Sequence, residues 1–486
     1  MLLVLLLVLP LLGGAVAAAA PRHPLAGWTA VGSNGAVLVL GTVLAVRVVG
    51  SAPVTGAWGV LRADALSAFM VVVIGVVSLL ATWLGVRSLV PDRRDPRATR
   101  GRATGYGVLV QAFVAAMLLA VLAANLGVLW VAVEATTIVT TFLVGHRRTR
   151  GALEASWKYL VICSVGIALA FLGTVLVYLA ALHAGGHSAH ALDWTSLMAD
   201  AHRMDPSVLR LAFALLVLGY GTKVGLAPMH SWLPDAHSQA PAPVSALMSG
   251  VLLTVAFYAI LRFKAVVDLA VGPAFPRTLL VVVGLLSLAV AASLLIAQRD
   301  YKRMLAYSSI EHMGLIALGA AAGIRLAIAA VLLQILGHGL TKTVLFLTSG
   351  EILAAEGTSQ IDAVRSLLAR RPVLGGLFGF GLVALLGLPP FSLFSSELLM
   401  TRAEFEVGLG WVAVVAAGLM VVIFVAVVGH ARHMLLGPSD AGHPAPPPPR
   451  WVTLPLVGAL VACAVIGVSA WPLDGLLQAA ARVVAP

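Results

Sequence analysis

Cysteine and charge are both scarce in this sequence of 486 residues. Charged side chains make up 10% of it, and its two cysteines are Cys163 and Cys463. Each cysteine stands alone within an apolar run, and neither belongs to a Cys-x-x-Cys pair. This spacing argues against iron–sulfur clusters and thiolate zinc sites in the chain. We therefore expect two buried, inert thiols.

Nucleotide-binding motifs are also missing. The sequence contains no Walker A motif and no Gly-x-Gly-x-x-Gly that opens a βαβ unit, so we expect no nucleotide site. The linkers between apolar runs are too short for a soluble domain. In a soluble protein, a net charge of +11 would suggest a nucleic-acid partner. In a membrane protein it more often reflects biased loop charges, and we expect no nucleic-acid partner.

Long apolar runs dominate what is present. The chain is 60% hydrophobic with a mean hydropathy of +1.02, and its apolar runs are long enough to cross a lipid bilayer as helices of about 20 residues. The runs are continuous rather than alternating, which excludes a transmembrane β-barrel. We predict an all-α polytopic membrane protein with about 14 transmembrane helices. The predicted spans are 1–20, 31–50, 66–86, 106–124, 126–145, 158–182, 208–228, 241–263, 278–297, 304–322, 326–350, 373–393, 409–430 and 452–472.

The first span has the length of a signal peptide. It lacks a charged beginning, so we interpret it as a helix. The outer loop 183–207 carries four histidines, His183, His187, His190 and His202. A metal site is one interpretation of this loop, and a solvated polar loop is the other.

The loops that join the predicted spans alternate between the two sides of the membrane, and lysine and arginine are concentrated on one side. Nineteen of the 31 fall on one side and ten on the other, while Lys223 and Lys342 lie within spans. The positive-inside rule assigns the richer side to the cytoplasm. Both termini then face outward from a cell membrane of bacterial type. The nineteen are Arg22, Arg87, Arg93, Arg94, Arg97, Arg100, Arg102, Arg147, Arg148, Arg150, Lys158, Arg299, Lys302, Arg303, Arg365, Arg370, Arg371, Arg432 and Arg450.

A short motif recurs late in spans seven and twelve. Gly-Leu-Ala-Pro at 225–228 returns as Gly-Leu-Pro-Pro at 387–390. An odd number of spans separates the two, so a five-helix repeat would be inverted in the membrane, as in many transporters. Gly and Pro break helices and are tolerated there only inside protein or beside water. The sequence thus predicts two inverted five-helix repeats with helices seven and twelve broken.

The repeat divides the chain into five parts. We expect N-terminal helices one to three, a first repeat, a second repeat, an extended Pro-rich linker and a C-terminal helix fourteen. Their boundaries are 1–100, 101–265, 275–432, 437–450 and 451–486.

A charge at the bilayer centre costs about 2.5–3.5 kcal/mol, so ionisable residues inside membrane spans usually have a function. His338 and Lys342 are four residues apart and share one helix face. The candidates for a proton relay are Glu134, Lys223, His338, Lys342, Glu397, Glu311 and His312. Secondary candidates are His230, Asp235, His237 and Glu351.

Each of these residues also has a purely structural interpretation. Glu134 and Lys223 could form a static ion pair, and His338 could bond a neighbouring carbonyl. Glu311 and Glu351 could be solvated near the interface, and Glu397 could cap the restarting helix twelve. Together, however, they form a series of acids and bases through the bundle. Burial disfavours the charged form of an ionisable side chain, and a nearby opposite charge favours that form. Movement of a glutamate towards or away from Lys223 would therefore change the proton affinity of the lysine.

Three segments carry a family resemblance. GTKVGLAPMHSWLPDAHSQAPAPVSALMSG at 221–250 resembles the signature of the antiporter-like subunits of respiratory complex I and membrane-bound hydrogenases. RDYKRMLAYSSIEHMGLIALG at 299–319 and HGLTK at 338–342 resemble further segments. The similarity covers roughly residues 100–430, and within this family the chain is most similar to hydrogenase-4 component F.

The resemblance implies 14 helices with both ends outside and a proton channel. It places the channel residues of the family on Glu134, Lys223, Lys342 with His338, and Glu397. Some relatives carry a lysine or histidine midway along span eight, where this chain offers Thr254 and Ser249. The central link would then run through water or through His230, His237 and Glu311. The long lateral helix of some relatives is also not expected here.

Four functions remain open from the sequence. The favoured one is a proton-translocating subunit of a redox-driven complex, either hydrogenase-4/formate hydrogenlyase-like or NADH:quinone oxidoreductase-like. Its partners would be other membrane subunits and a peripheral redox module, which would hold the cofactors. The alternatives are a cation/proton antiporter subunit of Mrp type, a membrane subunit of an energy-coupled inorganic-carbon uptake complex, and a structural scaffold.

Overall fold

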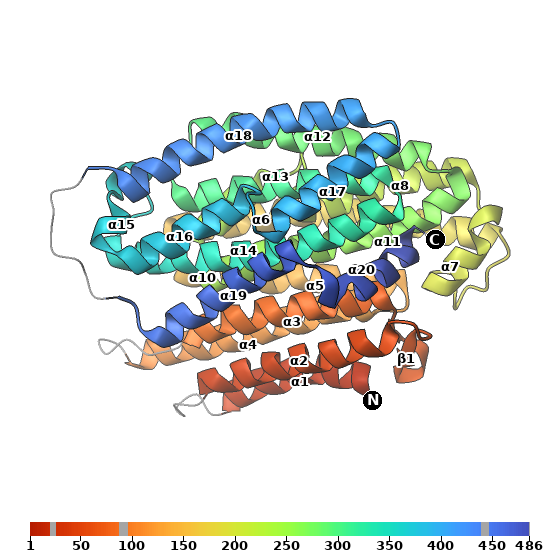
Figure 1. Cartoon of the computed structure of the whole chain (residues 1–486). Coiled ribbons are helices and arrows are strands. Elements are labelled where there is room, and N and C mark those ends of the chain that lie inside the picture. Colours follow the sequence, from red (N-terminus) through yellow and green to blue (C-terminus); the bar gives the residue numbers. More distant parts are fainter. Residues whose placement is uncertain (20–25, 87–95, 439–446, 486) are drawn as a thin grey trace.

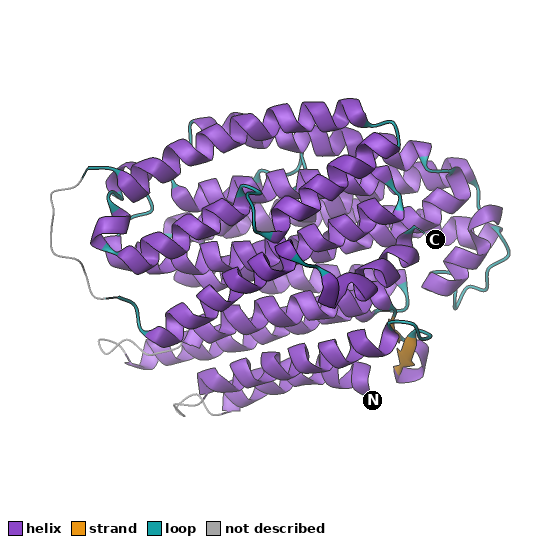
Figure 2. Cartoon of the chain, in the orientation of Figure 1, coloured by secondary structure: helices purple, strands orange, loops and turns teal. Residues whose placement is uncertain are grey.

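The chain folds into a bundle of long helices that lie roughly side by side (Figure 1). The computed structural model describes residues 1–19, 26–86, 96–438 and 447–485. Helix accounts for most of the described chain (Figure 2). Both termini lie at the same end of the bundle (Figure 1), as an even number of crossings requires. Four of the arginines that set the predicted orientation, Arg22, Arg87, Arg93 and Arg94, lie outside the described residues.

Every predicted span coincides with helix. The helices that match them are α1 (Leu2–Ala19), α2 (Ala26–Val48), α3 (Ala65–Gly85), α4 (Pro96–Leu122), α5 (Leu126–Val144), α6 (Arg150–His183), α8 (Pro206–Val224), α10 (Ala242–Leu247) with the π-helical turn η5 (Met248–Leu252) and α11 (Leu253–Val271), α12 (Ala274–Ile296), α13 (Tyr301–Ala322), α14 (Arg325–Glu356), α16 (Pro372–Leu385), α18 (Gly410–Leu436) and α19 (Arg450–Val468).

Twelve helices within the described residues are long and apolar enough to cross a membrane. The chain is therefore a multi-pass membrane protein. The two remaining predicted spans lie in α13, whose first turn carries Lys302 and Arg303, and in α16, which is shorter than a full crossing. The number fourteen stays a prediction, as do the five domain boundaries.

Several short elements join the long helices. They are the turns η1 (Ala57–Gly59), η3 (Gly145–Arg147), η4 (Ala201–Arg203) and η6 (Ile361–Ala363), and the short helices α7 (Trp194–Asp200), α9 (Trp232–Gln239), α15 (Leu367–Arg370), α17 (Ser392–Glu406) and α20 (Trp471–Val484).

Three details differ from the prediction. The fold is not wholly helical, because β1 (Val54–Gly56) and β2 (Leu61–Ala63) pair as an antiparallel hairpin. Gly59 allows the turn between them through its positive φ of 91°. Span six begins at Arg150, eight residues before the predicted 158, because Thr149 caps the helix through Ala152 N. Finally, α20 follows α19 and packs against α3 and α14.

Local signals place Lys223 at the end of α8. Asp205 caps this helix through Ser207 N at 2.7 Å, and Pro206 occupies its first position. Gly225 ends it in the left-handed conformation with φ 83°. Lys223 therefore lies in the last turn, immediately before the break.

The two predicted breaks have the same local structure. Gly225 and Gly387 both adopt positive φ, and the Ala227–Pro228 and Pro389–Pro390 peptides are both cis. After the second break the chain restarts as α17. The breaks in spans seven and twelve are thus present, while their relation by an inverted repeat remains a prediction.

Close contact between α6 and α8 depends on Gly219. A Cβ at this position would lie 2.6 Å from the Gly166 carbonyl oxygen and closer still to Ala170 N. We expect Gly219→Ala to destabilise the protein by about 1–3 kcal/mol, because two backbones must separate. The measurement is thermal unfolding of the purified protein in mild detergent. Gly418→Ala is the matched control, since a Cβ at Gly418 would meet no atom within 4 Å. Equal stability of the two variants would contradict the expectation.

Candidate functional site

Lys223 is fully buried at the end of α8. Its ammonium donates to Thr137 Oγ1 at 2.8 Å and to Tyr159 OH at 2.5 Å. Both partners are neutral hydroxyls, and Lys223 forms no salt bridge with any described residue. The Tyr159 hydroxyl in turn lies 2.5 Å from Thr140 Oγ1. A buried lysine held only by neutral groups lacks the counter-ion that usually accompanies a buried charge.

Glu134 joins this group through Thr137. The Thr137 hydroxyl donates to Glu134 Oε2 at 3.1 Å while it accepts from Lys223. The direct ion pair between Glu134 and Lys223 that the sequence left open is therefore not formed. A hydroxyl that accepts and donates at once can pass a proton between its two neighbours. We call Glu134, Thr137, Tyr159 and Lys223 the first cluster.

Lys342 forms a second centre on α14, also fully buried. Its ammonium donates to the Leu305 carbonyl at 2.6 Å and to Ser308 Oγ at 2.5 Å, both on α13. No described carboxylate lies within salt-bridge distance. Lys342 thus repeats the arrangement of Lys223, a buried ammonium among neutral acceptors.

Span eight contributes serine to this centre. Ser249 Oγ and Ser309 Oγ are 2.8 Å apart, and the Ser249 carbonyl accepts from His338 Nε2 at 3.3 Å. Thr254 bonds the Val251 carbonyl of its own helix. Of the two residues that the sequence offered for the central link, Ser249 contacts Ser309 and His338, and Thr254 bonds only within its own span.

His338 leads to two further titratable side chains, His312 and Glu397. The His338 and His312 rings are 5.1 Å apart, and His312 Nδ1 lies 3.9 Å from Glu397 Oε1. Gln334 Nε2 lies beside this contact and bridges it, 3.1 Å from His312 Nδ1 and 3.2 Å from Glu397 Oε1. The second cluster consists of Lys342, Ser308, His338, His312, Gln334 and Glu397.

Glu397 lies against the second break. A side chain at Gly387 would collide with its carboxylate, so the glycine leaves room for the acid. Glu311 is also buried, next to His312 on α13. Its carboxylate makes no hydrogen bond with a described residue, but it interacts electrostatically with Glu397 and Lys342.

A row of packed rings leads from Tyr159 of the first cluster to Phe346 on α14, the helix of Lys342. The Tyr159 ring packs edge-on against Trp232 at 4.9 Å, and Phe346 stacks on His237 at 5.2 Å. His237 lies between Trp232 and Phe346 and is fully buried. Neither of its ring nitrogens has a hydrogen-bond partner among the described residues. Two buried, unsatisfied nitrogens favour internal water at this point.

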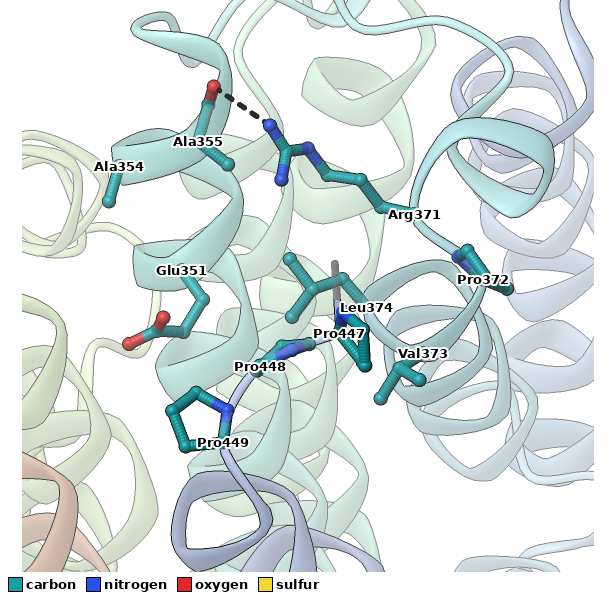
Figure 3. Close-up of a pocket in the computed structure, with 10 residues that line it drawn as sticks. All are labelled: Glu351, Ala354, Ala355, Arg371, Pro372, Val373, Leu374, Pro447, Pro448 and Pro449. Carbon is teal, nitrogen blue, oxygen red and sulfur yellow. Dashed lines mark hydrogen bonds between the residues drawn. The ribbon is translucent and has the colours of Figure 1, made fainter. Parts of the chain in front are cut away.

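Three secondary candidates lie apart from both clusters. Asp235 forms surface ion pairs with Lys158 at 3.1 Å and Arg303 at 2.8 Å, which hold α6, α9 and α13 together. His230 is half-buried in the loop after the first break. Glu351 lies near the end of α14, in a pocket with Arg371 and the prolines at 447–449 (Figure 3).

The part of the chain that the structure describes contains no group of three or more His, Cys, Asp or Glu residues that could hold a metal. Of the loop histidines, His190 contacts Asp193 at 2.6 Å.

Several partners of the site were missed by sequence reasoning. Gln334 precedes His338 by four residues, as His338 precedes Lys342, so the spacing places all three on one helix face and could have identified Gln334. Thr137 follows Glu134 by three residues on one face of α5. Tyr159, Ser308 and Ser309 carry no comparable signal, because hydroxyls are common in buried helices.

Comparison with known proteins identifies the family to which the chain belongs. Residues 123–423 match the family model described as NADH:quinone oxidoreductase/Mrp antiporter, transmembrane. The chain is 43% identical over 320 residues to the hydrogenase-4 component F homolog of Methylacidiphilum infernorum. The aligned region covers 65% of this chain and 66% of that protein. The chain is 31% identical over 385 residues to hydrogenase-4 component B of Escherichia coli, covering 76% of this chain and 54% of that protein. The chain thus spans about half to two thirds of these relatives.

Solved structures share the fold over the whole chain. A chain of the membrane-bound sulfane sulfur reductase, an archaeal respiratory membrane complex, superposes with a TM-score of 0.89 at 24% identity and covers 99% of this chain and 97% of its own. That likeness concerns the fold.

Proposed function

Because the chain belongs to the family of membrane subunits that NADH:quinone oxidoreductases and Mrp antiporters share, we propose that it translocates protons within a redox-driven respiratory complex. Electron transfer would take place in a peripheral module, which would hold the redox cofactors. Other membrane subunits would flank the chain, as in the multi-subunit complexes of its structural neighbours.

One observation carries the proposal. Lys223 and Lys342 are both buried in the bundle and both bind only neutral oxygens among the described residues. Burial disfavours the charged form of an amine, so a buried lysine bound to neutral oxygens suits a group that takes up and releases a proton. A static scaffold gains nothing from two such sites, since a buried unpaired charge destabilises the fold.

Within each cluster the route follows the side-chain contacts described above. In the first, a proton on Lys223 reaches Glu134 through the Thr137 hydroxyl, which gives its own proton to Glu134 as it takes one from Lys223. In the second, Ser308 accepts from Lys342, and the rings of His338 and His312 lead towards Glu397. The step from Lys342 to His338 has no hydrogen bond among the described residues and would need water. Between the clusters, transfer would use water at His237.

Orientation and location belong to the same proposal. The basic loops would face the cytoplasm and both termini the outer side of a bacterial-type cell membrane, since positive loops are retained inside.

The test is purification of the complex from native membranes in mild detergent, followed by mass spectrometry of its subunits and metal analysis. Inverted membrane vesicles are assayed in parallel for proton uptake driven by hydrogen, formate or NADH. Nickel and iron with hydrogenase-like subunits would support the hydrogenase-type assignment. Small membrane subunits without redox metal, together with sodium flux in the absence of redox substrate, would favour the Mrp-type antiporter. Zinc alone would favour inorganic-carbon uptake.

A further inference from the structure

Gln334 occupies the junction between the last two titratable groups of the second cluster. It is fully buried on α14. Its amide nitrogen lies 3.1 Å from His312 Nδ1 and 3.2 Å from Glu397 Oε1. Its carbonyl oxygen accepts from Ser396 Oγ. One side chain thus joins α13, α14 and α17 at a single point.

The amide of Gln334 is oriented with its NH₂ group towards His312 and Glu397. Its carbonyl oxygen lies against Ser396 Oγ, which also lies within hydrogen-bond distance of the Ser392 and Leu393 carbonyls. The two protons of the NH₂ group match its two acceptors. His312 Nδ1 therefore accepts a hydrogen bond and carries no proton in this arrangement, and Glu397 is held as an acceptor.

An amide differs from the other links of the relay. Hydroxyls such as those of Thr137 and Ser308 can take up one proton while releasing another, but an amide NH₂ only donates at neutral pH. His312 Nδ1 and Glu397 Oε1 are 3.9 Å apart, beyond hydrogen-bond distance. While Gln334 donates to both groups, the lone pairs that would join His312 Nδ1 and Glu397 Oε1 directly are engaged by the amide.

We propose that Gln334 is a proton barrier between His312 and Glu397, which opens only when its amide leaves this position. This inference rests on the proposed function. With the amide displaced, the imidazole and the carboxylate can close to a direct hydrogen bond of about 2.7–2.9 Å. The proton then moves from protonated His312 to the Glu397 carboxylate, leaving a neutral imidazole and a carboxylic acid. Gln334 is a positioning residue, because it holds the two groups apart and takes no proton itself.

The experiment compares passive proton leak through variants of the full chain in proteoliposomes, with an internal pH-sensitive dye and an imposed potassium diffusion potential. Gln334→Glu places a titratable group of the same shape at the junction, and we expect the leak to rise about tenfold. Gln334→Leu keeps an apolar side chain between the two groups, and its leak should stay at the wild-type level. A merely structural role would alter both variants alike.

Two further variants guard against misfolding and unspecific effects. Ser396→Ala releases the amide carbonyl with a small change in volume, and its leak should rise, though less than that of Gln334→Glu. Gln111→Glu is the matched control, because Gln111 is equally buried on α4 and outside both clusters. Its leak should not rise.

The outcomes separate this inference from the proposed function. Wild-type leak in both Gln334→Glu and Ser396→Ala would overturn the barrier. An equal rise in Gln334→Glu, Gln334→Leu and Gln111→Glu would also overturn it. Redox-driven proton uptake is measured separately with Lys223→Met. If that uptake persists unchanged, the proposed relay fails, whatever the leak of the Gln334 variants.

Discussion

Replacement of Lys223 by methionine is expected to lower redox-driven proton translocation by about 10²-fold or more, the usual contribution of a positioned proton-transfer group. Methionine fills a similar volume but carries no exchangeable proton. Thr137 and Tyr159 would lose the ammonium that they bind, and Glu134 would lose its proton donor. The measurement is the initial rate of proton uptake by inverted membrane vesicles, normalised to the amount of assembled complex.

Lys223→Arg makes the test specific. Arginine keeps the positive charge but cannot release its proton in a protein, so we expect it to be as inactive as methionine. Near wild-type uptake by Lys223→Arg would show that the charge alone matters and that no proton passes through this residue. Glu351→Gln is the control, since Glu351 lies in a separate pocket with Arg371 (Figure 3), and its uptake should match that of the wild type.

Arg262→Met is expected to destabilise the protein by about 3 kcal/mol, the low end of the cost of breaking a buried ion pair, because Arg62 remains 3.3 Å from Asp64. Arg262 donates through both terminal nitrogens to Asp64, at 2.7 Å each. Its Nε donates to Tyr258 OH at 2.9 Å, and that hydroxyl donates to the Val121 carbonyl at 3.0 Å. The pair joins α3, which lies outside the predicted repeats, to α11 and α4.

Thermal unfolding in mild detergent measures the loss. The double variant Asp64→Asn with Arg262→Met should recover part of the stability, because no buried carboxylate is then left without its main partner. The exposed pair of Arg402 and Glu406 at 2.9 Å is the matched control. Arg402→Met should change stability by less than about 1 kcal/mol. Equal effects of the two arginine substitutions would contradict a structural role for the buried pair.

Hydropathy and local signals determined much of this protein. Every apolar run predicted as a span contains helix, because a chain segment carries its own solvation preference regardless of its neighbours. The breaks at Gly225 and Gly387 were visible because glycine and proline limit backbone conformation locally. Lys223, Lys342 and Glu397 stood out because charge is costly in hydrocarbon wherever it occurs.

The tertiary structure alone decided which of these residues meet. It inserted Thr137 between Glu134 and Lys223. It bridged His312 and Glu397 from the side with Gln334, and it packed a row of rings from Tyr159 through Trp232 to Phe346. It also placed Glu351 in a pocket with Arg371, near the end of α14. Hydroxyl and amide groups are inexpensive to bury when hydrogen-bonded and occur in many helices, so their sequence positions carry little information. Their role depends on partners contributed by other helices, often far away in the sequence, and only packing brings those partners within hydrogen-bond distance.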